Sequence, residues 1–489
     1  MPFARRGALD GLRGVFSLQV VLFHLDAVWF KQGFVGVDGF FVLSGFLITS
    51  MIIHETISSQ AFSYSRFYAR RTKRLLPSSL LVLVLTAWCY RTIAAPALIT
   101  EHRGAFLAGA SYIENWYLVM KEHNYFSQTA GDSPILHYRS LAVEEQFYMF
   151  WPLVVVSLLS WSSFKTTYVA HGCLFAFFVS LGLQYFNSGL SLEQRYYATP
   201  MRIYQLLGGA FLGVILKATM DVLDSGSLPP SLVTKPLKAQ GFGLCFGGLL
   251  GVLLLSTGLM PVDPTNAGFM CTFFTLVLIV GLELDDNSLP AKLLKSSLLQ
   301  FLGKHSYAIY LWHFPVIRIG RMLAMIHTDV SSIIVVLLIT IFLAWLTYLC
   351  VDRPIHSLSL SDSVTIGLGM LATFVAFSVI FIGFFPMQAP FNDSTTELKP
   401  ILEPTTPESD ELHLQILRPQ PGELSTPQVR IEPKNRIMLL GGDSFAREWS
   451  DVWQQLAFEY KCKAMIRCTD RCPWFHLEYQ MAGAGSANP

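Results

Sequence analysis

Charged side chains are scarce in this sequence of 489 residues. Asp, Glu, Lys and Arg make up only 14% of it, whereas 52% of the residues are hydrophobic. Soluble domains usually contain about 25% charged residues, so the deficit argues against a soluble globular protein and for a polytopic membrane protein. The formal net charge of +1 indicates no nucleic-acid partner.

Other common features are missing as well. Cysteine and histidine do not occur at the spacing of zinc ligands, so we expect no metal site. The sequence has no internal repeat and no coiled-coil pattern. It also lacks the pattern of a cleavable signal peptide. The first apolar run contains Arg13 and His24 and leads into further apolar runs, so we expect it to be a retained span.

Long apolar runs, by contrast, are abundant. A membrane-spanning helix needs about 20 mostly apolar residues, and about eleven segments meet this requirement. The sequence therefore predicts an all-α polytopic membrane protein in a lipid bilayer. The predicted spans are 13–30, 35–53, 75–98, 143–161, 166–186, 204–220, 241–260, 267–284, 303–320, 332–351 and 365–386.

Basic residues predict the orientation of these spans, because Lys and Arg concentrate in cytoplasmic loops. If the spans alternate, one side carries Arg5, Arg6, Arg66, Arg70, Arg71, Lys73, Arg74, Lys235, Lys238, Lys292 and Lys295. We therefore expect a cytoplasmic N-terminus and an extracytoplasmic tail.

The chain changes character after the last predicted span. Residues 387–433 are rich in Pro, Glu, Ser and Thr, which predicts an extracytoplasmic linker. In the remaining segment, 434–489, residues 436–442 have the pattern of a short buried strand and 446–460 have helical periodicity. Because about 55 residues are too few to complete such a domain, we expect a fragment of an α/β domain.

Ionisable residues within the predicted spans are the candidates for chemistry, because they usually face a polar interior. Arg13 and His24 are eleven residues apart, so they share one helix face and lie about 16 Å apart along the axis. A neutral imidazole at that depth can accept a proton from a hydroxyl group. The alternatives are an interfacial anchor for Arg13 and an interhelical hydrogen bond for His24. His313 lies among aromatic residues that equally mark an interfacial belt.

Two arginines form a second candidate site. Arg71 and Arg74 are spaced i, i+3, so they share a helix face where the third span begins. Two guanidinium groups on one face suit a phosphate-bearing ligand. The alternative is the ordinary excess of basic residues in a cytoplasmic loop.

Two carboxylate residues are the remaining candidates for a catalytic or binding role. Asp38 lies just inside the second predicted span, and Glu144 lies at the start of the fourth. The alternatives to a catalytic or binding role are hydration at the interface or a structural ion pair with Arg13 or Arg202.

Taken together, these segments resemble the acyltransferase-3 family of membrane O-acyltransferases, over about residues 8–355. The first resembling block is an arginine–x10–histidine pattern formed by Arg13 and His24. The full set of blocks, in order, is 9–14 (LDGLRG), 33–48 (GFVGVDGFFVLSGFLI), 67–77 (FYARRTKRLLP), 140–148 (SLAVEEQFY), 199–202 (TPMR) and 306–313 (SYAIYLWH). Two positions depart from the family pattern: Arg139 stands where the family usually has Trp, and Gln205 where it usually has Glu.

The tail is similar to the first block of an SGNH-hydrolase domain, which some family members carry after an additional helix, here 356–386. Asp443 and Ser444 match that block. A serine on a strand-to-helix turn is a possible nucleophile, but a helix cap explains it equally well. The later Gly, Asn and Asp-x-x-His blocks are absent from this sequence, and without them Ser444 is expected to be a poor nucleophile.

The resemblance implies O-acyl transfer from cytoplasmic acyl-CoA, a donor substrate and not a bound cofactor, to a hydroxyl group such as one on a surface glycan. It implies that His24 is the general base, with Arg13 and Glu144 as partners. It also implies that substrate is bound by Arg71, Arg74, Asp38 and Arg202. Two alternatives stay open, a proton-coupled transporter and a catalytically inactive receptor or scaffold, although the sequence lacks the repeated halves of many transporters.

Overall fold

The computed structural model describes residues 7–121, 133–187, 189–224, 230–323, 325–326 and 329–384, and five short strands in the tail. The chain divides into two compact units, Met1–Pro390 and Phe391–Pro489, and each is considered by itself.

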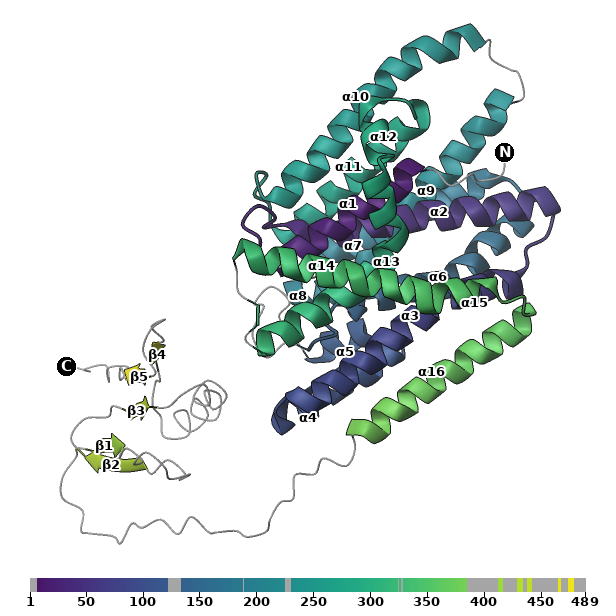
Figure 1. The fold of residues 1–489 in the computed structure, drawn as a ribbon. Helices are drawn as coiled ribbons and strands as arrows, with labels where there is room; N and C mark the ends of the chain where they lie inside the picture. Colours follow the sequence, from purple (N-terminus) through teal and green to yellow (C-terminus); the bar gives the residue numbers. More distant parts are fainter. Residues whose placement is uncertain are drawn as a thin grey trace, which may run out of the picture. The chain divides into compact units, whose positions relative to one another are not determined.

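The first unit is helical throughout its described residues (Figure 1). Its long helices are α1 (Gly7–His24), α2 (Gly36–Ser59), α3 (Tyr64–Ile93), α4 (Pro96–Ala110), α6 (Tyr138–Trp161), α7 (Thr166–Phe186), α9 (Thr199–Asp224), α10 (Pro230–Thr257), α11 (Pro264–Leu284), α13 (Ser297–Met322), α14 (Val330–Thr347) and α16 (Asp362–Phe384). The short ones are η1 (Gly33–Val35), α5 (Glu114–Lys121), α8 (Leu192–Tyr197), α12 (Leu289–Leu294), η2 (Tyr348–Asp352) and α15 (Arg353–Ser357).

Each of the eleven predicted spans overlaps a helix, although 75–98 runs past the end of α3 at Ile93 and into α4. Only nine helices among the described residues are long and apolar enough to cross a membrane. The two that fall short are α1 and α13. Both carry several ionisable residues, which lower their mean hydropathy. The first prediction, 13–30, is also displaced, because α1 begins at Gly7 and ends at His24.

Close helix crossings hold the site together. A Cβ atom at Gly303 of α13 would lie 1.7 Å from the carbonyl oxygen of Asp10 in α1. A Cβ atom at Gly45 of α2 would lie 1.8 Å from the carbonyl oxygen of Leu206 in α9. Only glycine permits these backbone contacts, and small residues at helix interfaces are typical of membrane bundles. The crossings join α1 to α13 and α2 to α9, the helices that carry most of the candidate residues.

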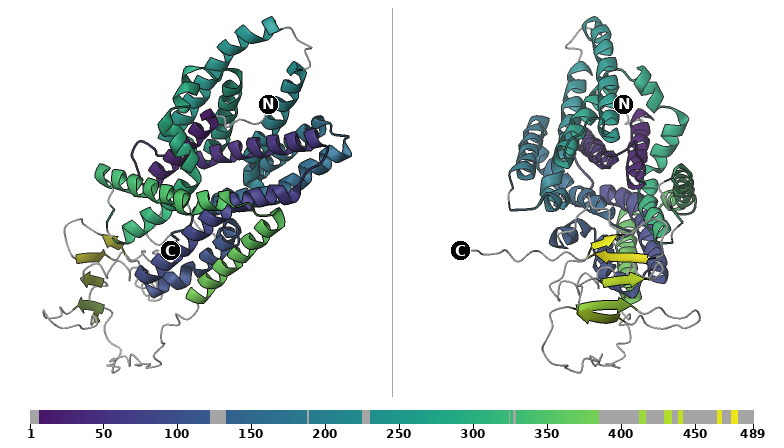
Figure 2. Two further views of the ribbon diagram at one scale, coloured as in Figure 1. Left: turned by 45° about the vertical axis from the view of Figure 1, so that its right-hand side comes forward. Right: turned by 90° about the vertical axis from the view of Figure 1, so that its left-hand side faces the viewer.

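The final helix of the first unit packs beside α3 and α4 (Figures 1 and 2). Gly369 of α16 faces Thr72 and Leu76 of α3. In the loop before α16, the carbonyl oxygen of Leu358 accepts a hydrogen bond from Lys73 Nζ at 2.7 Å. The helix therefore supports the side of α3 that lies next to the arginine-rich segment.

The second unit contains two small antiparallel sheets. The strands are β1 (Leu412–Ile416), β2 (Val429–Pro433), β3 (Met438–Gly441), β4 (Met465–Arg467) and β5 (Trp474–Glu478). β1 pairs with β2, and the other sheet has the order β3-β5-β4. β3 lies within the predicted strand 436–442, and β1 and β2 lie within the predicted linker. The predicted helix 446–460, Asp443 and Ser444 lie outside the described residues.

Candidate active site

Three buried histidines meet between α1, α6 and α13. His24 is the last residue of α1, His137 precedes the first residue of α6, and His313 lies in α13. The His24 and His313 ring centroids are 5.1 Å apart, and those of His137 and His313 are 5.3 Å apart. Phe314 packs against both His24 and His137. His24 makes the interhelical hydrogen bond given as the alternative interpretation, with His313 of α13, and this bond is part of a cluster of three imidazole rings.

Hydrogen bonds define the tautomers of these rings. His313 Nδ1 donates to the carbonyl oxygen of Tyr310 at 2.5 Å, which leaves its Nε2 as an acceptor. His24 Nδ1 lies 3.0 Å from the carbonyl oxygen of Val20 and 3.2 Å from His313 Nε2, so it carries the hydrogen. His137 Nε2 donates to the carbonyl oxygen of Leu311 at 3.0 Å. A neutral His24 in this tautomer has its basic lone pair on Nε2.

The C-terminus of α1 is fixed by an arginine of α13. Arg321 Nη2 donates to the carbonyl oxygen of His24 at 3.0 Å and to Asp26 Oδ2 at 2.7 Å. A cation at this position suits the negative end of a helix dipole. Arg321 thereby holds the backbone of His24 against α13.

The predicted arginines gather at the other end of α1. Arg13 interacts electrostatically with Arg74, Tyr148 and Glu144, besides an ion pair with Asp10 at 3.7 Å. The Arg71 guanidinium lies over the Tyr148 ring, 5.0 Å from its centroid. Asp10, Glu144 and Glu145 offset part of this positive charge. The clustered guanidinium groups suit a phosphate-bearing ligand.

Glu144 belongs to this arginine cluster. Its Oε1 accepts a hydrogen bond from Ser44 Oγ at 2.5 Å and another from the Tyr148 hydroxyl. The carboxylate is therefore held beside Arg13 and Arg71, whereas the His24 imidazole is held by Val20 and His313. The placement points to a role for Glu144 with the arginines, in contrast to the predicted role as a direct partner of His24.

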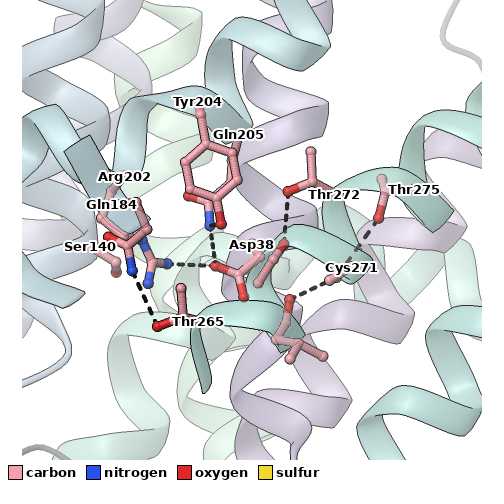
Figure 3. Close-up of polar contacts among 12 residues, drawn as sticks. Asp38, Ser140, Gln184, Arg202, Tyr204, Gln205, Thr265, Cys271, Thr272 and Thr275 are labelled. Atoms are coloured by element: carbon pink, nitrogen blue, oxygen red, sulfur yellow. Dashed lines mark hydrogen bonds and ion pairs between the residues drawn. The ribbon is translucent and has the colours of Figure 1, made fainter. Parts of the chain in front are cut away.

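A second charged cluster lies between α2 and α9 (Figure 3). Arg202 Nη2 and Asp38 Oδ1 form a buried ion pair of 2.5 Å, and Gln205 Nε2 donates to the same oxygen at 2.7 Å. This is the Arg202 ion pair anticipated as one interpretation of Asp38. Asp38 Oδ2 and Gln205 Oε1 are buried with no hydrogen-bond partner among the described residues. Two unpaired acceptors in one cluster suit a ligand with hydroxyl donors.

Arg139 brings a further positive charge into the buried interior. It stands 4.7 Å from the centroid of the Tyr196 ring, and Arg202 stands 4.4 Å from the same centroid. Arg139 also interacts electrostatically with His24 and Asp38, so it lies between the histidines and the ion pair. Arg139 stands where the family pattern usually has Trp. It contacts the neighbouring Tyr196 ring as a cation and not as a second aromatic ring.

Glu114 of α5 is a buried carboxyl group near Arg139. Both of its oxygens lack a hydrogen-bond partner among the described residues. Burial raises the pKa of Glu114 well above its ordinary value, and the positive charge of Arg139 only partly opposes this shift. Sequence reasoning did not single out Glu114, because α5 is short and lies outside every predicted span.

His137 is the other residue that the sequence analysis missed as a candidate. It lies before the predicted fourth span, where a polar residue needs no explanation. The signal that could have found it is its position, three residues before Ser140 in a resembling block. His313 was singled out, but its aromatic neighbours concealed its partnership with His24. Within the described residues, no group of three or more His, Cys, Asp and Glu could hold a metal ion.

Comparisons with known proteins identify the family of this chain. A family model described as an acyltransferase domain matches residues 6–349. O-acetyltransferase OatA of Staphylococcus aureus, in strains NCTC 8325 / PS 47 and COL, is 33% identical over 358 residues, which is 71% of this chain and 57% of that protein. The S. aureus protein SACOL0978 is 32% identical over 317 residues, 63% of this chain and 50% of its own. The chain thus spans about half the length of these curated relatives. No solved structure matches it.

Proposed function

Because this chain belongs to the acyltransferase-3 family of multi-pass membrane acyltransferases, we propose that it transfers an acetyl or related acyl group from cytoplasmic acyl-CoA to a hydroxyl acceptor such as a surface glycan. The observation that carries the proposal is the buried His24–His313 pair at one end of α1, with an arginine cluster at the other end. The similarity to OatA, an O-acetyltransferase by name, supports the same reaction class.

The proposed topology has eleven spans, with α1 and α13 added to the nine most apolar helices. Their polar residues are turned toward neighbouring helices, as expected for ionisable groups inside a bundle. The basic residues at the start of α3 support a cytoplasmic location for that end of the helix and for the N-terminus. The tail then lies outside the cytoplasm.

The donor end of the site is the arginine cluster. Arg71, Arg74 and Arg13 would bind phosphate groups of acyl-CoA, because guanidinium groups form strong hydrogen bonds with phosphate oxygens. Glu144 limits the repulsion among these arginines. From Arg13 to His24 the helix rises about 16 Å, so the acyl group must be carried along α1 by the long pantetheine arm of the donor.

The chemical step belongs to His24. Its Nε2 accepts the proton of the acceptor hydroxyl while the oxygen attacks the thioester carbonyl. The C–S bond breaks, the new C–O ester bond remains, and the leaving thiolate takes the proton back from His24. While His24 is protonated, its Nδ1–H donates to His313 Nε2, which stabilises the imidazolium.

The acceptor would bind beside Asp38 and Arg202. The unpaired acceptors Asp38 Oδ2 and Gln205 Oε1 match the hydroxyl donors of a sugar. In a full-length relative, an SGNH-like domain with the equivalents of Asp443 and Ser444 would receive the acyl group outside the membrane and complete its delivery. In this chain Ser444, without the later blocks, is expected to be a poor nucleophile.

The test uses the purified protein in nanodiscs, acetyl-CoA labelled in the acetyl group, and a surface-glycan extract. We expect transfer of label to the glycan by the wild type and a loss of about 100-fold or more in His24→Ala, since general base catalysis contributes about 10²–10⁴-fold. His171→Ala, at an exposed histidine of α7, is the matched control. Wild-type transfer by His24→Ala would exclude His24 as the base. Coupled uptake into proteoliposomes of the same protein, without transfer of label, would favour a transporter.

A further inference from the structure

A cavity of about 870 Å³ lies where α2 ends and α3 begins. Its wall includes the hydroxyl-bearing residues Ser58, Ser59 and Ser63, the ring of Phe62, and Arg66 at the start of α3. Arg71 and Arg74, the predicted phosphate-binding residues, are not part of this wall. The cavity is therefore a neighbour of the donor cluster and not the same site.

The wall of the cavity favours an anion. Arg66 and Arg70 both contribute to it, and only Arg70 is paired, with Glu55 at 3.0 Å. Arg66 makes no ion pair within the described part of the chain. Ser63 caps α3 by accepting a hydrogen bond from the Arg66 N–H at 3.3 Å, so the positive end of a 30-residue helix also faces this region.

The same helix connects the cavity to the donor cluster. Arg66, Arg70 and Arg74 are spaced i, i+4 and i+8, so they form a stripe along one side of α3. From Arg66 to Arg74 this stripe rises about 12 Å. Arg74 in turn interacts electrostatically with Arg13 and Arg71. The cavity and the cluster are therefore two basic regions on one helix, with Arg66 in the cavity wall, Arg74 in the cluster, and Arg70 between them paired with Glu55, which also lines the cavity.

We propose that the cavity binds the 3′-phosphoadenosine end of acyl-CoA, with Arg66 contacting the 3′-phosphate and Phe62 contacting the adenine ring. This inference rests on the proposed function. A donor with a phosphate monoester at one end and a pyrophosphate farther along matches two separated basic regions. A lipid headgroup with one phosphate would use only one of the two basic regions. It would also place no ring against Phe62, which lines the cavity while packing on Tyr64 and Phe67.

The test measures binding rather than transfer. Dissociation constants of acetyl-CoA and of its 3′-dephospho analogue are compared in nanodiscs of neutral phosphatidylcholine. The wild type should bind the analogue about tenfold more weakly, the effect of one charge-assisted hydrogen bond. Arg66→Ala should weaken the binding of acetyl-CoA by the same factor and leave the dissociation constant of the analogue unchanged. Arg91→Ala, at an exposed arginine near the other end of α3, is the control and should change neither.

Four results would overturn the assignment. Equal binding of the two thioesters by the wild type, or equal weakening of both by Arg66→Ala, removes the 3′-phosphate from the cavity while leaving the proposed function intact. If Arg66→Ala changes thioester binding only in nanodiscs that contain anionic phosphatidylglycerol, and equally for both thioesters, the cavity is a lipid site. If neither thioester binds at all, the proposed donor itself is wrong.

Discussion

At the scale of single residues, the proposed reaction depends on which nitrogen of each buried imidazole carries hydrogen. His313 can accept from His24 because its own Nδ1 is committed to the Tyr310 carbonyl oxygen. Replacing His313 with Phe keeps an aromatic ring but removes this acceptor. We expect kcat to fall about 10- to 100-fold, the loss of about 1.4–3 kcal/mol expected for a hydrogen bond to a charged group, with little change in KM for the donor.

A second histidine of α13 provides the control for this prediction. His305 Nδ1 bonds the carbonyl oxygen of Phe301 at 2.7 Å, four residues earlier, much as His24 bonds Val20. His305→Phe should therefore retain the wild-type kcat. Steady-state kinetics with labelled acetyl-CoA measures both variants. Equal losses in both, or a rise in KM alone for His313→Phe, would contradict a role for His313 in stabilising the charged form of His24.

Glu114 gives a prediction about pH. Its pKa is raised by burial, so the folded protein holds a proton that the unfolded chain releases at lower pH. Stability contributed by the neutral carboxyl is fully present below the unfolded pKa. It is lost as pH rises toward the raised, folded pKa. We expect Glu114→Gln to remove this loss, so that its thermal unfolding temperature exceeds that of the wild type increasingly with pH.

Thermal unfolding in detergent, from acidic to mildly alkaline pH, measures this effect. Glu101→Gln serves as the control, because Glu101 is an exposed carboxylate on α4 and its replacement should leave the wild-type pH dependence unchanged. Parallel curves for the wild type and Glu114→Gln would show that Glu114 does not bind a proton on folding.

At the scale of helices, glycine contacts decide which elements meet. The Cβ atom of Gly303→Ala would lie 1.7 Å from the carbonyl oxygen of Asp10, so α1 and α13 must separate. We expect a destabilisation of about 1–3 kcal/mol, as for overpacked cores, and a loss of activity because His24 moves away from His313. Gly243→Ala on α10 is the matched control, since nothing lies within 4 Å of its added Cβ atom.

Thermal unfolding and labelled transfer are measured on both glycine variants. A stable, fully active Gly303→Ala would mean that the two helices can separate without disturbing the histidines. A loss of stability in Gly243→Ala of the same size would instead reflect a general intolerance of alanine for glycine in this bundle.

The sequence predicts which segments form helices much better than it predicts which helices pack against one another. Apolar runs identify eleven segments, and 166–186 coincides with α7. Hydropathy carries no information about which helices pack together. It therefore could not predict the hydrogen bond between His24 and His313, which lie 289 positions apart in the sequence. The spacing of Arg13 and His24 did place them on one helix. Glu144 accepts hydrogen bonds from Ser44 and Tyr148, neighbours that sequence position did not indicate because it gives only the height of Glu144 along α6. Its partnership with His24 stays a prediction.

At the scale of the whole molecule, the site has two ends. The arginine cluster lies with Glu144 at one end of α1, and the histidines with Arg139 and the Asp38–Arg202 pair lie toward the other. The proposed transfer from a cytoplasmic donor to an extracytoplasmic acceptor would require such a separation of the two binding sites. The two ends are connected by α1 itself, whose apolar side chains Leu12, Phe16 and Val20 are fully buried.

The helix α16 lies beyond the matched acyltransferase domain, which ends at residue 349, and yet it supports α3. Its Gly369 faces Thr72, and the Leu358 carbonyl oxygen before the helix accepts a hydrogen bond from Lys73. Thr72 and Lys73 directly follow Arg71 in α3.

We therefore expect a chain truncated after residue 390 to bind acetyl-CoA like the full chain. Truncation after residue 357, which also removes α16, should weaken acetyl-CoA binding at least about tenfold, because the exposed face of α3 lets its arginines shift. Dissociation constants and thermal unfolding of the two truncated chains in nanodiscs measure the difference. Equal binding by both would show that α16 only anchors the tail, whereas a loss in both would mean that the second unit itself contributes to the donor site.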